Sequence, residues 1–297
     1  MGVRPRANRG KPPQRCPPLA LGKQAKDEPE GGEGMPYYEK RIYSGRVLEQ
    51  ERYYATDGGR PLNSIRVQPT TEAQEKLNDI QSWRKLVRVI NCNFSRENGD
   101  LCLTLTFRRY MNREAARKAY SKFLRKVRDM RRKQKLADLK YILISETQSG
   151  RQHAHLILNA GISVEELTAL WDELGTVWAS VLDNSNNYKD LAAYLLRQHK
   201  PRRGSQSDEN AKEQRQRNER RWTGSRNLEK PVVQKRKCRP VTVNTMPRAP
   251  KGYELLPDFQ RDADRFGNMW IRWMCIRVED RAGAKNEGRR GKRSIAT

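Results

Sequence analysis

The pattern that most restricts the fold is an ordered series of strand and helix signals that begins at Leu101. Leu101–Phe107 alternates apolar residues with smaller or polar ones, as a half-buried strand does. A long helix follows, capped by Asn112 and carrying an apolar stripe at helical spacing. The next elements are strand, strand, helix, strand and helix, at 141–146, 152–159, 163–171, 176–182 and 188–199. This order predicts an α+β domain with a split βαβ, RRM-like antiparallel sheet, helices on one face and the other face free.

Two of the three histidines in the chain, His153 and His155, occupy alternate positions of the strand predicted at 152–159. Alternate residues of a strand project to one face, so both imidazoles point the same way. If the turn at 149–150 has two residues, Glu146 lies directly opposite His153. Two imidazoles and a carboxylate suit a divalent metal such as Mn²⁺ or Mg²⁺, with Zn²⁺ as an alternative. A slip of one residue in the turn would move Glu146 to the other face.

The helix predicted at 188–199 places Tyr194 on one stripe with Asp190 and Arg197. A phenol is a poor nucleophile at neutral pH unless a cation lies nearby and a metal polarises its target. Arg197, one turn after Tyr194, can steady the phenolate or the attacked phosphate. Tyr188 lies about 120° away around the helix, so we expect it to pack rather than share the site.

Taken in order, these motifs resemble those of HUH endonucleases, and more narrowly the rolling-circle replication initiators of small phages and plasmids. The matching motifs are the strand at 103–107, the segment 146–155 with both histidines, and the helical segment 193–197. Residues 93–100 before them and the run Trp222-Thr223-Gly224-Ser225-Arg226 after them are also similar to that group. The resemblance covers about residues 90–231.

The resemblance implies an activity. A metal held by His153, His155 and Glu146 would polarise a scissile phosphate in single-stranded origin DNA. Tyr194 would attack it, leaving a 5′-phosphotyrosyl link and a free 3′-hydroxyl that primes replication, and the strand would later be rejoined. Members of this group usually have lysine where this chain has Arg197, and some have a second tyrosine where it has Gln198. We therefore expect an enzyme with a single tyrosine nucleophile.

The composition is consistent with a nucleic-acid partner. The chain has 61 Lys and Arg against 35 Asp and Glu, a net charge of +26, which favours a polyanion. No apolar segment is long enough to span a membrane, and the five cysteines form no CxxC pair. We expect a protein of the cytoplasm of a bacterial or archaeal host cell. No P-loop is present, so a host helicase and a polymerase are expected partners.

The basic and aromatic residues expected to contact single-stranded or hairpin origin DNA are Arg151, Arg202, Arg203, Trp222 and Arg226. From composition, the element pattern and the resemblance together we expect a disordered basic arm, an N-terminal extension packed on the core, the endonuclease domain that the resemblance implies, a charged linker or helix, a C-terminal part associated with the core and a basic tail. These segments span 1–35, 36–85, 86–200, 201–221, 222–280 and 281–297.

Three other interpretations remain. A relaxase or transposase of the same superfamily would use the same motifs. A non-catalytic RNA- or DNA-binding protein on an RRM-like sheet would carry aromatic residues on its central strands, where this chain has Thr104, Thr106 and the two histidines. A purely structural zinc site is disfavoured because the cysteines are not paired in sequence.

Overall fold

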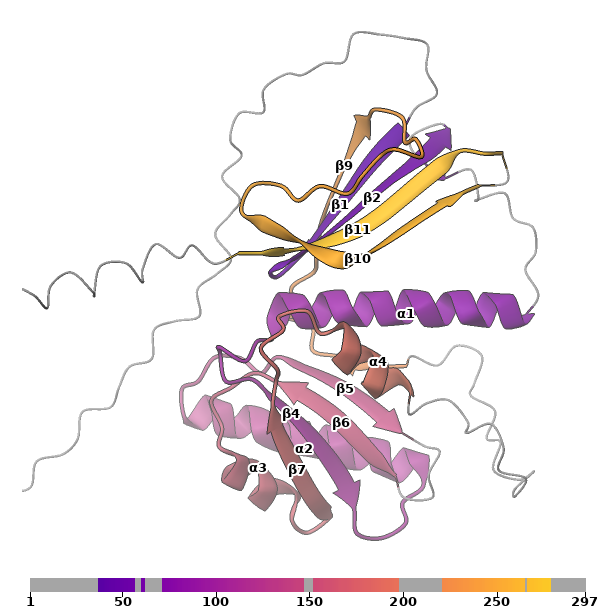
Figure 1. The fold of residues 1–297 in the computed structure, drawn as a ribbon. Helices are drawn as coiled ribbons and strands as arrows, with labels where there is room; N and C mark the ends of the chain where they lie inside the picture. The colour runs from indigo at the N-terminus through magenta and orange to yellow at the C-terminus, as the bar shows by residue number, and fades with distance from the viewer. Residues whose placement is uncertain are drawn as a thin grey trace, which may run out of the picture. The chain divides into compact units, whose positions relative to one another are not determined.

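The computed structural model describes residues 37–56, 60–61, 71–146, 152–197, 221–264 and 266–278. Within these residues the chain forms two antiparallel sheets and four helices, so the α+β class predicted from the sequence is confirmed (Figure 1). No helix in this part of the chain is long and apolar enough to cross a membrane.

The five-stranded sheet contains the predicted split βαβ order. Its strands are arranged β7-β4-β6-β5-β8, and each neighbouring pair is antiparallel. The strands are β4 (Leu101–Phe107), β5 (Tyr141–Glu146), β6 (His153–Leu158), β7 (Gly175–Val181) and β8 (Thr223–Gly224). The sequence predicts the first four; the short edge strand β8 is an addition to them.

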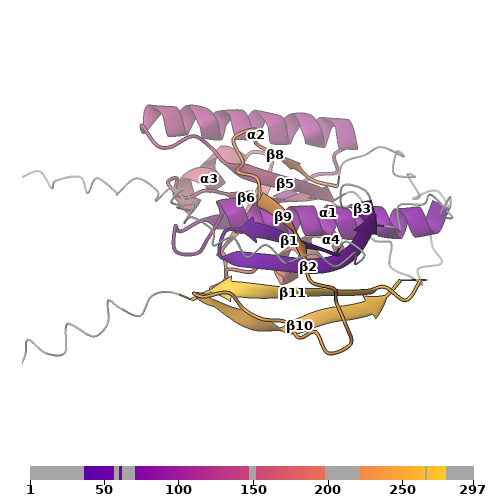
Figure 2. The ribbon, with the colours of Figure 1, turned by 90° about the horizontal axis from the view of Figure 1, so that it is seen from above.

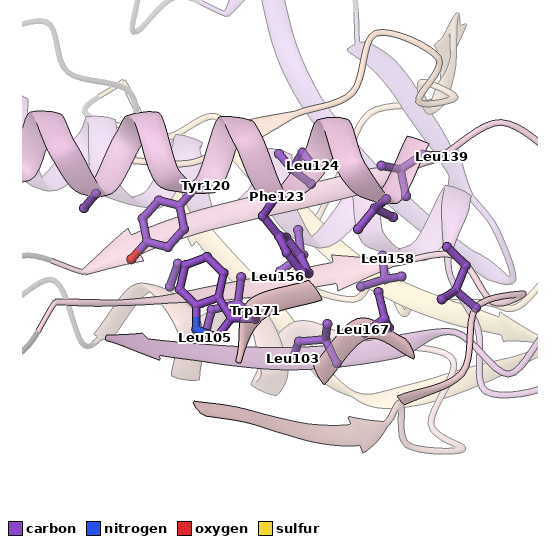
Figure 3. Close-up of a cluster of buried hydrophobic side chains, with 14 of the residues drawn as sticks. Leu103, Leu105, Tyr120, Phe123, Leu124, Leu139, Leu156, Leu158, Leu167 and Trp171 are labelled. Carbon is purple, nitrogen blue, oxygen red and sulfur yellow. The ribbon is translucent and has the colours of Figure 1, made fainter. Parts of the chain in front are cut away.

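Two helices, α2 (Arg113–Lys133) and α3 (Val164–Trp171), cover one face of this sheet. Helix α2 begins at the predicted cap Asn112. Helix α3 begins at Ser163, which forms a capping box with Glu166, a signal that the sequence Ser-x-x-Glu also shows. Large apolar side chains from both layers fill the core between them, including Leu103, Leu105, Leu156, Leu158, Tyr120, Phe123 and Trp171 (Figure 3). Each fully buried side chain of this size stabilises the fold by about 1.5–3 kcal/mol, so this layer determines which face each strand turns toward the helices.

The opposite face, which the sequence predicts to be free, is partly covered. Two helices, α1 (Thr71–Asn93) and α4 (Lys189–Arg197), pack there on buried side chains of the sheet, namely Cys102, Ile142, Ile144 and Ile157. Figure 1 shows α4 on the side of the sheet away from α2. The open part of this face lies toward β7, where Thr176 and Trp178 are exposed.

Helix α1 overturns one expectation. Residues 87–94 roughly alternate apolar and polar side chains, a pattern that by itself predicts a strand, but helix α1 continues to Asn93. The reason is that α1 contacts both sheets: Leu86 and Ile90 are buried in the core with α4, while Arg88 bonds to the second sheet. A helix buried on two sides loses the single apolar stripe that distinguishes a helix from a strand.

The second sheet joins the two ends of the described chain. An N-terminal hairpin, β1-β2, pairs with C-terminal strands in the order β10-β11-β2-β1-β9, and β3 is attached to β2. Figure 2 shows β11 beside β2. The strands are β1 (Tyr37–Ser44), β2 (Val47–Thr56), β3 (Arg60–Pro61), β9 (Val232–Cys238), β10 (Tyr253–Ala263) and β11 (Met269–Arg277).

Glu49 of β2 forms a polar link between this sheet and α1. Its carboxylate is buried and accepts hydrogen bonds from Arg88 of α1 and Arg272 of β11, each at 2.7 Å. Burial by itself would raise the pKa of Glu49, but the two guanidinium groups outweigh burial and hold the pKa below its usual value. Removing one partner of such a buried pair leaves the others uncompensated.

We expect Glu49→Gln to lower the free energy of unfolding at neutral pH by about 3 kcal/mol. Because the pKa of Glu49 is lower in the folded state, its contribution is present above the unfolded value, about 4.3, and is lost as the pH falls through the folded value. The difference in free energy of unfolding between wild type and variant, measured by urea unfolding, should therefore be smaller below about pH 4 than at neutral pH. Glu254→Gln, an exposed position on β10, is the control and should change little. An equal difference in free energy of unfolding at neutral pH and at acidic pH would contradict the role of the Glu49 ion pairs.

Candidate active site

The alternation of β6 decides where the two histidines point. Ala154, Leu156 and Leu158 are buried in the core with α2 and α3. Because successive residues of a strand face opposite sides, His153 and His155 project to the other face, the one that carries α4. The predicted common orientation of the two imidazoles is therefore what the packing of β6 requires.

The register between β5 and β6 is the one that the sequence predicts. Glu146 pairs with His153, and Ile144 pairs with His155. Directly paired residues share a face, so Glu146 occupies a register position on the histidine side of the sheet. The turn at 147–151, on which the prediction depended, and the side chain of Glu146 lie outside the part of the chain that the structure describes.

The ring of His155 is held by a neighbour on β4. His155 is only 3% exposed, and its Nδ1 lies 3.2 Å from Oγ1 of Thr104, the residue paired with it in the sheet. A hydrogen bond at Nδ1 orients the imidazole and leaves Nε2 as the nitrogen for a metal. The sequence predicts only that Thr104 lies on a strand, and its place beside His155 follows from the β4–β6 register.

Tyr194 lies beside this histidine. Its ring centroid is 5.9 Å from that of His155, in an edge-to-face arrangement, and the tyrosine is 55% exposed. The same helix buries Ala192, Leu195 and Leu196, so the apolar side of α4 faces the core and leaves the tyrosine at the surface next to the histidine. The structure therefore brings Tyr194 to the histidine face.

Helix α1 fixes the start of α4 and so the position of Tyr194. Asn91 accepts a hydrogen bond from the backbone N–H of Tyr188 at 3.0 Å, and the indole N–H of Trp83 donates to the carbonyl of Lys189 at 3.2 Å. Tyr188 itself is buried, and burial raises its pKa to about 12. This agrees with the prediction that Tyr188 packs rather than shares the site.

The imidazoles of His153 and His155 lie within reach of one shared ion. Their centroids are 5.4 Å apart and their planes are almost perpendicular. An ion about 2.1 Å from one nitrogen of each ring would lie roughly 3.2 Å from each centroid, so centroids up to about 6.4 Å apart are compatible with joint binding. The described side chains contain no group of three or more His, Cys, Asp or Glu placed to hold a metal. A three-ligand set that includes Glu146 stays a prediction.

The other predicted residues are less closely tied to this site. Arg197 ends α4, but nothing is described of its side chain. Arg226 is exposed just after β8, and Trp222 is half-buried against the core with the ammonium of Lys85 5.8 Å from its ring centroid. The predicted DNA contacts that fall outside the described residues are Arg151, Arg202 and Arg203.

One exposed residue on this face was missed. Trp178 of β7 is paired with Thr104, which is paired in turn with His155, so the three share one face. Its side chain is 65% exposed. The sequence shows Trp178 within a predicted strand, but placing that strand beside β4 needs the sheet order, which local alternation does not supply.

One segment of the chain matches a known protein family. Residues 100–200 match the model of a protein family described as Replication-associated protein ORF2/G2P. This segment is about a third of the chain and runs from β4 through α4, so it includes both histidines and Tyr194. No curated protein and no solved structure gave a significant match.

We expect Thr104→Val, which keeps the side-chain shape, to weaken Mn²⁺ binding by about 10- to 100-fold because the ring of His155 loses its hydrogen bond. Calorimetric titration of the purified protein with Mn²⁺ measures this. Thr168→Val, the same change on α3 far from the histidines, should leave the affinity unchanged. Equal affinities in wild type and Thr104→Val would show that Thr104 does not orient a ligand.

Proposed function

We propose that the chain is a replication initiator that nicks and rejoins single-stranded origin DNA through a 5′-phosphotyrosyl intermediate. The observation that carries the proposal is the contact between Tyr194 and His155: an exposed phenol beside a histidine pair on one face of a sheet. The match of residues 100–200 to a replication-associated family supports the same role, because that segment supplies every residue of the proposed centre.

Each residue of the proposed centre has its own role in the reaction. A divalent cation, Mn²⁺ or Mg²⁺, held by His153, His155 and Glu146 would polarise the scissile phosphate. The phenolic oxygen of Tyr194 attacks phosphorus and loses its proton as the O–P bond forms. The bond from phosphorus to the 3′-oxygen breaks, and that oxygen takes up a proton to become the 3′-hydroxyl. Attack by a 3′-hydroxyl on the phosphotyrosine reverses these steps and rejoins the strand.

Arg197 and Thr104 would assist the attack of Tyr194 on the phosphate in different ways. Arg197 follows Tyr194 by three residues and would steady the charge on the attacked phosphate, but a guanidinium does not give up its proton readily. Thr104 would keep His155 in the orientation in which Nε2 faces the ion. Proton transfer from Tyr194 would therefore go to water or to another group at the site.

The proposed partners rest on the net charge of the chain and on the absence of a P-loop from its sequence. A net charge of +26 favours DNA, and binding should weaken steeply with salt as counterions are released. We propose single-stranded or hairpin origin DNA as the substrate, with Arg151, Arg202, Arg203, Trp222 and Arg226 among its contacts. A host helicase and polymerase would act on the nicked origin in the cytoplasm of a bacterial or archaeal cell.

A relaxase or a transposase would use the same centre. Both cut DNA through a tyrosyl link, and they differ in what is cut and where the strand goes. The family match favours replication over transfer or transposition.

We expect Tyr194→Phe to abolish covalent attachment to DNA, because the variant keeps the ring and loses the attacking oxygen. A random-sequence pool of single-stranded oligonucleotides is incubated with the protein and Mn²⁺, and adducts are trapped on a denaturing gel and sequenced. Tyr110→Phe changes an exposed tyrosine outside α4 and should still form the adduct. An adduct with Tyr194→Phe would overturn the assignment of the nucleophile.

His153→Ala tests the other half of the centre. It should prevent adduct formation while DNA binding without metal stays near the wild-type level, because charge and not the metal supplies most of the affinity. Cutting by His153→Ala at the wild-type rate would remove the histidine pair from the mechanism.

A further inference from the structure

The feature that the proposed mechanism leaves unused is Trp178. All six tryptophans of the chain lie within the described residues, and the other five are buried or half-buried. Trp178 is 65% exposed although it belongs to a sheet. An indole that lies largely in water contributes little to the core and is available to a ligand.

The sheet register places this indole on the face of the proposed centre. Trp178 pairs with Thr104 and Thr104 pairs with His155, which gives one transverse row across β7, β4 and β6 that ends beside Tyr194. Neighbouring strands are about 4.8 Å apart, so the backbones of Trp178 and His155 are separated by about 10 Å. That distance suits a base near a phosphate bound at the histidines.

The neighbourhood of Trp178 is open and polar rather than apolar. Thr176, the next residue of β7 on this face, is exposed and pairs with Thr106. Helices α1 and α4 bury other residues of the face, namely Cys102, Ile142, Ile144 and Ile157. An apolar protein partner would need a wider apolar surface than a single indole between threonines, whereas one unpaired base needs only a π-face to stack on.

We propose that Trp178 is a stacking platform for one unpaired base of single-stranded DNA, next to the phosphate that Tyr194 attacks. This inference rests on the proposed function for the location of the phosphate. It adds to that function a subsite that holds the strand by stacking, independent of base identity, while the centre acts on the backbone.

The test separates stacking from charge. Binding is measured by fluorescence anisotropy, without metal, for labelled oligothymidylate and for an abasic oligomer of the same length. Trp178→Ala should weaken binding of oligothymidylate by about 5- to 100-fold and leave binding of the abasic oligomer unchanged. Trp178→Phe should stay within about 3-fold of the wild type, because phenylalanine still stacks.

Two controls test whether weaker binding comes from the loss of any exposed aromatic side chain or from a less stable fold. Phe259→Ala removes a partly exposed aromatic side chain from β10 and should not change the preference for oligothymidylate. The thermal unfolding midpoint of Trp178→Ala should match the wild type, because the side chain is mostly in solvent. Equal weakening of both oligomers would overturn stacking as the cause.

Running the adduct assay on the same proteins keeps the two proposals apart. If the wild type forms the adduct and Trp178→Ala retains full preference for oligothymidylate, the stacking subsite is wrong and the nicking function stands. If no protein forms the adduct but Trp178→Ala loses the preference, Trp178 binds single strands and the nicking function is wrong. If the preference is absent from the wild type as well, the subsite is wrong whatever the adduct assay gives.

Discussion

The strict alternation of β6 controls the rest of the proposed centre. Ala154, Leu156 and Leu158 gain stabilisation by facing α2 and α3, and a shift of one residue would place both imidazoles in that apolar core. The cost of burying polar rings without partners makes the observed register strongly preferred. Hydrophobic packing on one side of the sheet thus determines where the two imidazoles point on the other side. The hydrogen bond with Thr104 then orients the ring of His155.

The position of Tyr194 depends on a different layer. Helix α4 is short, and isolated helices of this length are marginal in water, so its place is set by tertiary contacts. Those contacts come largely from α1, through Asn91 and Trp83 at the start of α4 and through shared apolar packing. Because α1 is also tied to the six-stranded sheet by Arg88 and Glu49, the second sheet supports the helix that carries the proposed nucleophile.

The sequence predicted the elements whose signals are local. Strands β4 to β7, the caps of α2 and α3, and the pairing of Glu146 with His153 follow from alternation, capping residues and a short turn. What it missed is non-local. Residues 87–94 alternate as a strand does because α1 is buried from two sides. Trp178 lies on the site face because of the sheet order, which local alternation does not supply. The edge strands β8, β9 and β10 carry weak patterns because they are short or largely exposed.

The chain order of the six-stranded sheet has a consequence for synthesis. Its hairpin β1-β2 is made first, yet the strands that flank it, β9 and β11, are made last, after every strand of the other sheet. Glu39 in that hairpin is matched by Arg236, and Glu49 by Arg272, both near the end of the chain. Before the C-terminal strands are synthesised, Glu39 can pair only with Arg41 and Arg52 of its own hairpin, and Glu49 with Arg88 of α1, so the bonds to Arg236 and Arg272 form late. The segment from β4 to α4 can already fold as a nascent domain by then.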